Sequence, residues 1–216
     1  LIMNKVKISR HLHHKLSSLT EKERQRRILT FLQTSTGGNF YIDQNGDFWN
    51  ATIYIDHSQT FDTVTDPNVA YEGGKLFGEF IHLTQDFDPS DLVEVIPRFH
   101  DMSFRFEQFE EALRNASQER LKNSQAYIDI AKGLKKEMHI LQELKDDGQI
   151  ILRVTHNDTK ISNALFDMEG KGLCVIDTDT IMPGIIHYDF GDAIRTICNT
   201  AAEDEKNLEK VKFNKE

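Results

Sequence analysis

The 216-residue sequence is poor in cysteine, and it has no long apolar run. The two cysteines, Cys174 and Cys198, stand in apolar surroundings without metal-ligand spacing, which favours reduced thiols in a core and indicates no redox chemistry. The longest apolar runs, such as 150–152, fall far short of the roughly 20 residues that span a bilayer, and the start does not look like a signal peptide. We therefore expect a cytoplasmic protein that does not bind a membrane.

An excess of basic charge is also missing, because the formal net charge is -9. Attraction to a nucleic-acid backbone or to an anionic membrane needs a basic face, so general binding of either is excluded. A nucleotide neutralised by a metal ion stays compatible with this charge. Three hydrolase signatures are absent as well: the Gly-x-Ser-x-Gly elbow, the His-Glu-x-x-His helix and the Cys-x-Pro-x-Arg pattern of sulfatases.

What is present is a globular composition, with 38% hydrophobic residues and 14 phenylalanines to supply a core. The first half predicts a helix over 1–19 and then strands over 27–33, 40–42 and 48–55, with Asn45-Gly46 as a tight hairpin turn. The start without methionine and the charged end at 206–216 indicate a chain cut from a longer one. We expect an α+β protein with a small β-rich lobe over 1–56 and a mainly helical lobe over 57–216.

The predicted helical lobe begins at Asp66-Pro67, which supplies a cap and a preset first turn for a helix running to about residue 83. Further predicted helices cover 104–115 and 118–145. The pattern then changes to short strands over 150–155, 164–166 and 173–176, of which the last two form a hairpin.

Chemistry-bearing residues concentrate in the loop after the strand at 150–155. This loop, which we call the catalytic loop, spans 156–163 and carries His156, Asp158, Lys160 and Asn163. Fourteen positions beyond Asn163, a second apolar strand ends at Asp177 and Asp179; we call residues 177–180 the metal loop. Phosphoryl transfer needs a carboxylate to orient the attacking hydroxyl, oxygen ligands for Mg²⁺ and positive charge at the phosphate, and these two loops can supply all three.

Other polar residues have a simpler interpretation. We expect Asp189 and Asp192 to cap a helix or make structural hydrogen bonds, whereas Asp179 could equally be a ligand or a turn-forming residue. The group of His11, His13 and His14 is typical of a solvated helix face rather than a zinc site. Gly73-Gly74-Lys75 lacks the full phosphate-loop pattern and is assigned to helix packing.

The pattern His156-x-Asp158-x-x-x-x-Asn163, followed by an apolar strand ending in Asp177, resembles the catalytic and metal-binding loops of kinases with the protein-kinase-like fold. In detail it looks like the aminoglycoside phosphotransferase and choline kinase branch. The flanks narrow the resemblance to N-acetylhexosamine 1-kinases, and they are Asp-Thr-Asp-Thr-Ile-Met-Pro-Gly at 177–184, Tyr-Asp-Phe-Gly-Asp-Ala-Ile-Arg at 188–195, Ile-Pro-Arg-Phe-His-Asp at 96–101 and Phe-Glu-Glu-Ala-Leu at 109–113.

This resemblance implies a role for each residue. Asp158 would be the base or orienting carboxylate, Lys160 would contact phosphate, and His156 would brace the loop by hydrogen bonding. The resemblance also implies Mg²⁺ as the cofactor, with its ligands at Asn163, Asp177 and Asp179. The main chain of a hinge would pair with the adenine of ATP at Tyr54, Ile55 and Asp56.

The implied reaction moves the γ-phosphoryl group of ATP to a sugar, the 1-hydroxyl of an N-acetylhexosamine. Two alternatives remain open at this point. The acceptor could be another small alcohol of the choline or aminoglycoside type. The chain could also be a non-catalytic nucleotide- or sugar-binding module, because the phosphate-covering loop and strand lysine of such kinases lie upstream of the helix that starts this sequence.

Overall fold

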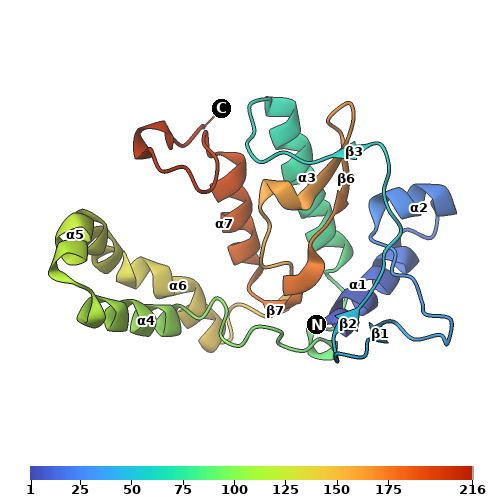
Figure 1. Cartoon of the computed structure of the whole chain (residues 1–216), viewed down its shortest axis with the longest axis horizontal. Coiled ribbons are helices and arrows are strands. Elements are labelled where there is room, and N and C mark those ends of the chain that lie inside the picture. Colours follow the sequence, from blue (N-terminus) through green and yellow to red (C-terminus); the bar gives the residue numbers. More distant parts are fainter. Residues whose placement is uncertain (216) are drawn as a thin grey trace. The chain divides into compact units, whose positions relative to one another are not determined.

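The computed structural model describes residues 1–215, and Figure 1 shows the order of the elements along the chain. The chain divides into two compact units. One consists of Leu1–Val95 together with the chain from Arg153 onward, and the other is Ile96–Leu152. The division into lobes at residue 56 stays a prediction.

Helices of the first unit begin and end where the sequence offers caps. The helix α2 (Glu21–Arg27) starts with a capping box in which Thr20 and Glu23 each bond the other's main chain. The helix α3 (Pro67–Leu83) starts at Asp66, whose side chain accepts from the Asn68 N–H. The remaining helical segments are α1 (Ile2–Lys15), α7 (Ile186–Ile197), η1 (Pro89–Asp91), η2 (Ile161–Asn163), η3 (Thr178–Thr180) and η4 (Leu208–Lys210).

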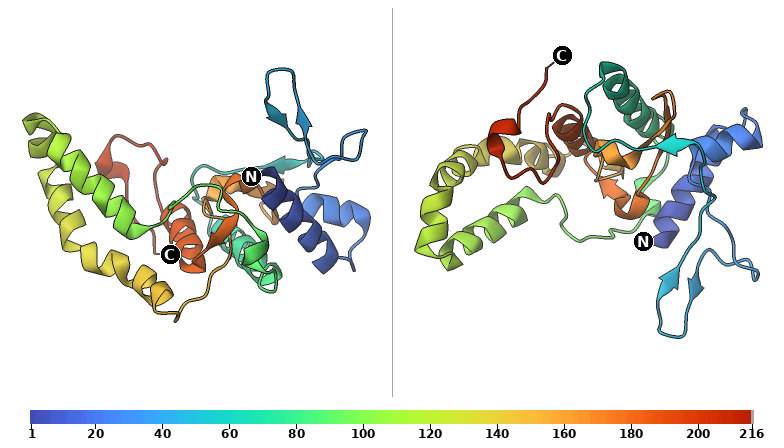
Figure 2. Two further views of the ribbon diagram at one scale, coloured as in Figure 1. Left: turned by 90° about the horizontal axis from the view of Figure 1, so that it is seen from below. Right: turned by 45° about the horizontal axis from the view of Figure 1, so that its top comes forward.

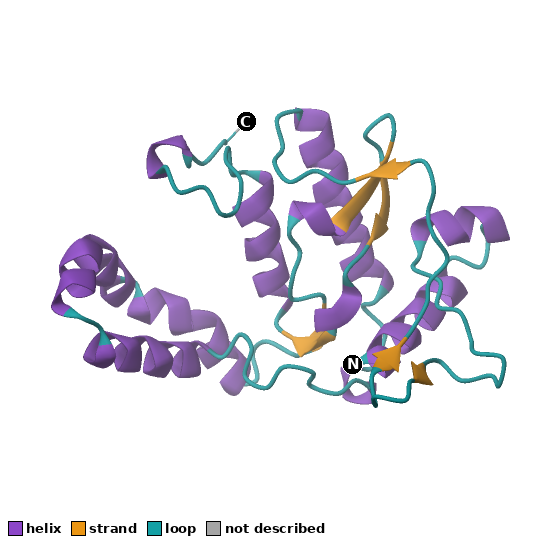
Figure 3. Ribbon diagram, in the orientation of Figure 1, coloured by secondary structure: helices purple, strands orange, loops and turns teal. Residues whose placement is uncertain are grey.

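The strands are short and all pair antiparallel (Figure 3). One sheet has the order β3 (Ser58–Gln59), β5 (Ala164–Asp167) and β6 (Gly172–Val175), which confirms the predicted β5–β6 hairpin. A second pair joins β4 (Arg153–Thr155) to β7 (Met182–Gly184), and a third is the hairpin of β1 (Tyr41–Ile42) and β2 (Phe48–Trp49). The first two sheets deliver the two loops of interest, because β4 precedes the catalytic loop and β6 precedes the metal loop.

The predicted strand over 27–33 is wrong at its start, which is helical, and the rest of the segment makes only one β-bridge. The capping box carries α2 through Arg27, and the chain after this helix makes a single isolated bridge between Phe31 and Thr52. The predicted strand over 48–55 shrinks to Phe48–Trp49. These two predicted strands therefore do not form a continuous hydrogen-bonded ladder.

The second unit consists of three helices, α4 (Met102–Asn115), α5 (Gln118–Gly133) and α6 (Lys135–Asp146), drawn from two sides in Figure 2. The single helix predicted over 118–145 is therefore wrong, because it breaks at Leu134 between α5 and α6. Glycine has a high cost in a helix interior, and Gly133 stands at this break. The side chain of Gln142 on α6 accepts from the Met102 N–H at the start of α4, at 2.7 Å.

The hydrophobic core of the first unit includes Ile161 of the catalytic loop. Ile161 and Phe166 are fully buried, and Gly73 on α3 lets that helix approach them, because an added Cβ would stand 2.6 Å from Ile161 Cδ1. The motif Gly73-Gly74-Lys75 thus lies inside a packed helix, as expected. Cys174 is a free, buried cysteine as predicted, and burial raises the pKa of its thiol to about 12.

No helix among residues 1–215 is long and apolar enough to cross a membrane.

Candidate active site

His156 forms the fixed centre of the catalytic loop. Its side chain is fully buried, and the rings of Phe77 and Phe80 on α3 meet it edge-on. The Asp158 N–H donates to Nδ1 at 3.3 Å, which leaves Nε2 to carry the proton and donate to the Ile176 carbonyl at 2.9 Å. Burial lowers the pKa of His156, in keeping with a neutral ring. The ring therefore links the start of the catalytic loop to the residue that follows β6.

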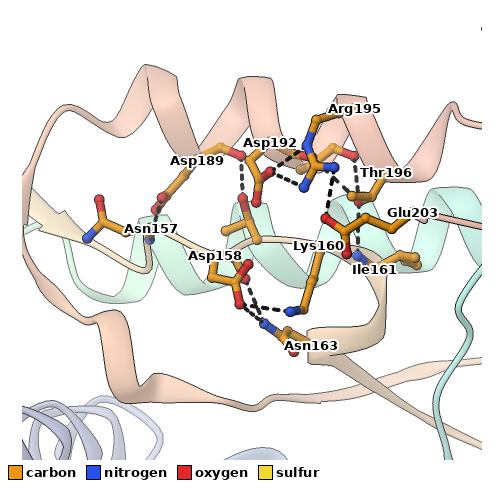
Figure 4. A network of polar contacts seen from close by, with 12 residues as sticks. Asn157, Asp158, Lys160, Ile161, Asn163, Asp189, Asp192, Arg195, Thr196 and Glu203 are labelled. Carbon is orange, nitrogen blue, oxygen red and sulfur yellow. Dashed lines mark hydrogen bonds and ion pairs between the residues drawn. The ribbon is translucent and has the colours of Figure 1, made fainter. Parts of the chain in front are cut away.

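Asp189, near the start of α7, holds the main chain of the same loop (Figure 4). Its two carboxylate oxygens accept from the N–H groups of His156 and Asn157, each at 2.8 Å, and its carbonyl accepts from the Thr159 hydroxyl. Burial raises the pKa of Asp189 to about 6, although the two N–H donors favour the ionised form. The structural role predicted for Asp189 agrees with this geometry, but the sequence did not indicate that its partner would be the catalytic loop.

The turn at Asn157 brings the two loops together. Asn157 has a φ of 65°, a left-handed conformation that asparagine tolerates better than most residues. Its amide donates to the Thr180 carbonyl at 2.9 Å, and the Thr180 hydroxyl donates to the His156 carbonyl at 2.6 Å. Thr180 was not singled out in the sequence, because nothing in its local pattern separates it from an ordinary turn residue.

Asp158 projects from the loop between two donors. Its Oδ2 accepts from Asn163 Nδ2 at 2.8 Å and lies 3.2 Å from Lys160 Nζ (Figure 4). Burial opposes the charge of Lys160, but the hydrogen bond with Asp158 and the charges of Asp158, Glu203 and Asp177 raise its pKa, so the ammonium stays charged. The structure thus brings three of the predicted residues together, with a partly exposed carboxylate held beside a cation.

The metal loop begins at Asp177, which has a φ of 55° and an exposed side chain. The Ile176 N–H donates to the Asn163 carbonyl at 2.8 Å, so the residue before Asp177 is tied to the end of the catalytic loop. Asp179 is also exposed, and its Oδ1 lies 2.6 Å from Nζ of Lys5 on α1. Lys5 is a functional candidate that the sequence did not reveal.

A magnesium ion fits the chemistry of these donors. Asn163 uses Nδ2 to bond Asp158, so its Oδ1 is the atom that would face a metal, and Asp177 and Asp179 add carboxylate oxygens. Among residues 1–215, no three His, Cys, Asp or Glu side chains cluster as a ready-made metal site. Mg²⁺ usually takes only one or two protein carboxylates and completes its shell with water and substrate phosphates, so a small donor set suits it.

The three residues of the predicted hinge differ in accessibility. Tyr54 is 84% exposed, whereas Ile55 is buried. The Ile55 carbonyl accepts from the Ser58 hydroxyl at 2.7 Å, and the Asp56 carbonyl accepts from Arg26 at 2.8 Å. Adenine pairing at Tyr54, Ile55 and Asp56 stays a prediction.

The histidines of α1 do not form a solvated face, contrary to the prediction. His11 Nε2 lies 3.0 Å from the Leu83 carbonyl, and His13 Nε2 lies 3.0 Å from the Thr30 hydroxyl. Only His14 is exposed. These rings fasten α1 to neighbouring segments.

Two short strands, β4 and β6, each lead into a polar loop, and comparison with known proteins places this arrangement in the protein-kinase-like fold. The sequence profile of the phosphotransferase enzyme family matches residues 12–209, so the chain belongs to this family. The fold is similar to the crystal structure of an aminoglycoside phosphotransferase from Alicyclobacillus acidocaldarius subsp. acidocaldarius DSM 446, with a TM-score of 0.61 and 15% sequence identity. The match covers 90% of this chain and 58% of that one, so the chain spans somewhat more than half the length of that protein.

Proposed function

We propose that this chain carries the catalytic half of a kinase that transfers the γ-phosphoryl group of ATP to the 1-hydroxyl of an N-acetylhexosamine. The observation that carries the proposal is the arrangement of Asp158, which is partly exposed and held by both Lys160 and Asn163. Membership of the phosphotransferase family supports the reaction class.

In the proposed reaction, Asp158 orients the acceptor hydroxyl and takes its proton as the new oxygen–phosphorus bond forms. The bond between the γ-phosphorus and the bridging oxygen breaks, and ADP leaves. Base assistance of this kind contributes about 10²- to 10⁴-fold in rate. Lys160 places positive charge near the transferred group, and Asn163 with Asp177 and Asp179 would hold Mg²⁺, which when bound neutralises phosphate charge.

In this scheme, His156 and Asp189 do not contact the substrate but hold the loop that carries Asp158. They fix the main chain before and at Asp158 through bonds to the His156, Asn157 and Asp158 N–H groups. A carboxylate on a loop fixed in this way needs little rearrangement to meet a hydroxyl, which is the benefit of preorganisation.

The acceptor is the finer part of the proposal, and it is supported by the sequence flanks 177–184 and 188–195 that resemble hexosamine 1-kinases. An aminoglycoside-type or choline-type alcohol is the second candidate, favoured by the fold of the aminoglycoside phosphotransferase. A non-catalytic binding module is the third, because the chain spans only part of that protein.

Phosphorus NMR with Mg-ATP and a panel of N-acetylhexosamines, aminoglycosides and choline tests the proposal, using both this chain and the full-length gene product. We expect an anomeric sugar phosphate signal, and we expect Asp158→Asn to remove it while the circular dichroism spectrum is unchanged. Asp86→Asn is the matched control, because Asp86 also pairs with a lysine, Lys15, at 2.8 Å but lies in no predicted site. If a phosphorylated product forms only with another alcohol, that alcohol replaces the N-acetylhexosamine as the proposed acceptor. If neither folded protein forms any product, the result favours the non-catalytic binding module.

A further inference from the structure

Lys5 is unusual among the lysines of α1 because its side chain is only 10% exposed. A buried ammonium is costly unless it is paired and hydrogen bonded. Its ion-pair partner is Asp179 of the metal loop, 174 positions away in the sequence, at 2.6 Å. Asp179 itself is well exposed, so its carboxylate is the accessible end of this pair.

The residue before Lys5 reaches the same segment. Asn4 is buried, and its Nδ2 donates to the carbonyls of Ile181 and Val93, each at 2.8 Å. Its Oδ1 accepts from the Val93 N–H at 3.1 Å. The first turn of α1 therefore contacts the metal loop and the residue that follows it at two points, through an ion pair with Asp179 and one hydrogen bond to the Ile181 carbonyl.

Of these two contacts, only the ion pair involves a predicted metal ligand, Asp179. Lys5 binds Oδ1 of Asp179 and leaves the second carboxylate oxygen for another partner. Carboxylates that ligate metals are themselves commonly hydrogen bonded, and such outer partners set the orientation of the ligand. The main chain from Asp179 leads back through Thr178 to Asp177, so an orienting contact at Asp179 also restrains the placement of Asp177.

We propose that Lys5 is a positioning residue of the metal loop, which orients the Asp179 carboxylate for a divalent cation and couples the position of α1 to cation affinity. This inference rests on the proposed function, because it assumes that the metal loop binds the cation of the kinase reaction. Lys5 is not a catalytic residue in this scheme, since it reaches the cation only through Asp179.

The test measures Mn²⁺ binding by electron paramagnetic resonance of the free ion, without nucleotide, in the full-length gene product. Lys5→Met keeps an unbranched chain next to a cavity of about 40 Å³, so it fits the same space without charge. We expect it to weaken Mn²⁺ affinity by about 10-fold or more, and Lys5→Arg to restore most of the loss. Lys15→Met is the matched control on the same helix, because it removes the ion pair with Asp86 and leaves the metal loop alone.

A double-mutant comparison separates positioning from general loosening of α1. In an Asp179→Asn background, Lys5→Met should cause less than a 2-fold further change in Mn²⁺ affinity, because the two residues act through one contact. We expect Asn4→Ala to lower stability in urea unfolding, because it removes three hydrogen bonds, and its effect on Mn²⁺ affinity gives the size of a purely structural effect on the same turn.

Binding by the wild type and by Asp177→Asn distinguishes the two ways in which the proposal can fail. If the wild type binds Mn²⁺ and Asp177→Asn abolishes binding, while Lys5→Met binds normally or more tightly, the Lys5 proposal is overturned and the metal site stands. If the wild type binds no Mn²⁺, or Asp177→Asn binds as well as the wild type, the metal site of the proposed function fails and the Lys5 proposal fails with it.

Discussion

The catalytic loop and the metal loop lie side by side, yet they are held in different ways. The catalytic loop has a buried histidine at its start and a buried aspartate, Asp189, bonded to its main chain. The metal loop presents exposed carboxylates at Asp177 and Asp179, of which the second is gripped by Lys5 from α1.

This difference matches the two tasks proposed for the loops. A group that must meet a hydroxyl in one geometry gains from being fixed in advance, because reorganisation during the reaction is then small. Carboxylates that bind and release a cation with its substrate need access to solvent. Substitutions at four positions test whether the catalytic loop is fixed in advance and the metal loop is not.

The largest effect is expected for Asp177→Asn. Asparagine tolerates the left-handed backbone at this position, so the fold should be retained, but a carboxylate is lost from the metal loop. We expect turnover to fall about 1,000-fold with the free energy of urea unfolding changed by less than about 0.5 kcal/mol. If Asp177→Asn also lowers the free energy of unfolding by several kcal/mol, Asp177 stabilises the fold, and the contrast with the catalytic loop is lost.

The second effect is a loss of stability in Asp189→Asn. The carboxylate accepts two main-chain N–H groups, whereas an amide would turn its own NH₂ toward one of them and leave that buried donor unpaired. The expected cost is about 3 kcal/mol in urea unfolding. Asp192→Asn on the same helix is the comparison, because Asp192 bonds a partly exposed arginine, Arg195, instead of the loop. A cost of less than about 1 kcal/mol for Asp189→Asn would contradict the role of this carboxylate as the anchor of the loop.

The third effect concerns Gly184 at the end of β7. A Cβ there would stand 2.4 Å from Thr155 Oγ1, just before the catalytic loop. Gly184→Ala should therefore cost about 2 kcal/mol of stability by overpacking, as measured by urea unfolding. Gly191→Ala is the control, because its Cβ would meet nothing within 4 Å on the exposed face of α7. If both variants unfold at the same urea concentration, the packing between Gly184 and Thr155 is less tight than the 2.4 Å distance indicates.

The smallest effect is a dependence of stability on pH that arises from His156. Because burial lowers the pKa of this ring below the ordinary 6.5, the unfolded chain takes up a proton first as the pH falls, and stability is lost below about 6.5. Between pH 7.5 and 5.5, the wild type should lose about 1 kcal/mol more than His156→Gln. The raised pKa of Asp189 acts in the opposite direction, but it is present in both proteins and cancels in the difference. An equal pH dependence in the two proteins would mean that His156 titrates normally.

Local patterns in the sequence were enough to predict the elements that carry their own signals. The cap at Asp66 with Pro67 predicted the start of α3, and two short strand-like segments on either side of a turn predicted the β5–β6 hairpin. The order of His156, Asp158 and Asn163 predicted that these residues share one polar loop, and the structure joins Asp158 to Asn163 directly, whereas the catalytic role of the loop stays a prediction. The segment 27–33 failed because its strand-like composition competes with a capping box that extends the preceding helix.

The sequence by itself determined the class of the protein, because the spacing of the two loops and the apolar strands before them are local properties of the chain. Only the tertiary structure decided what holds those loops. Asp189 lies 33 residues from the histidine whose N–H it accepts, and Lys5 lies 174 residues from Asp179. Contacts over such distances leave no periodic trace in the sequence, because they depend on how helices pack against the core rather than on neighbouring residues.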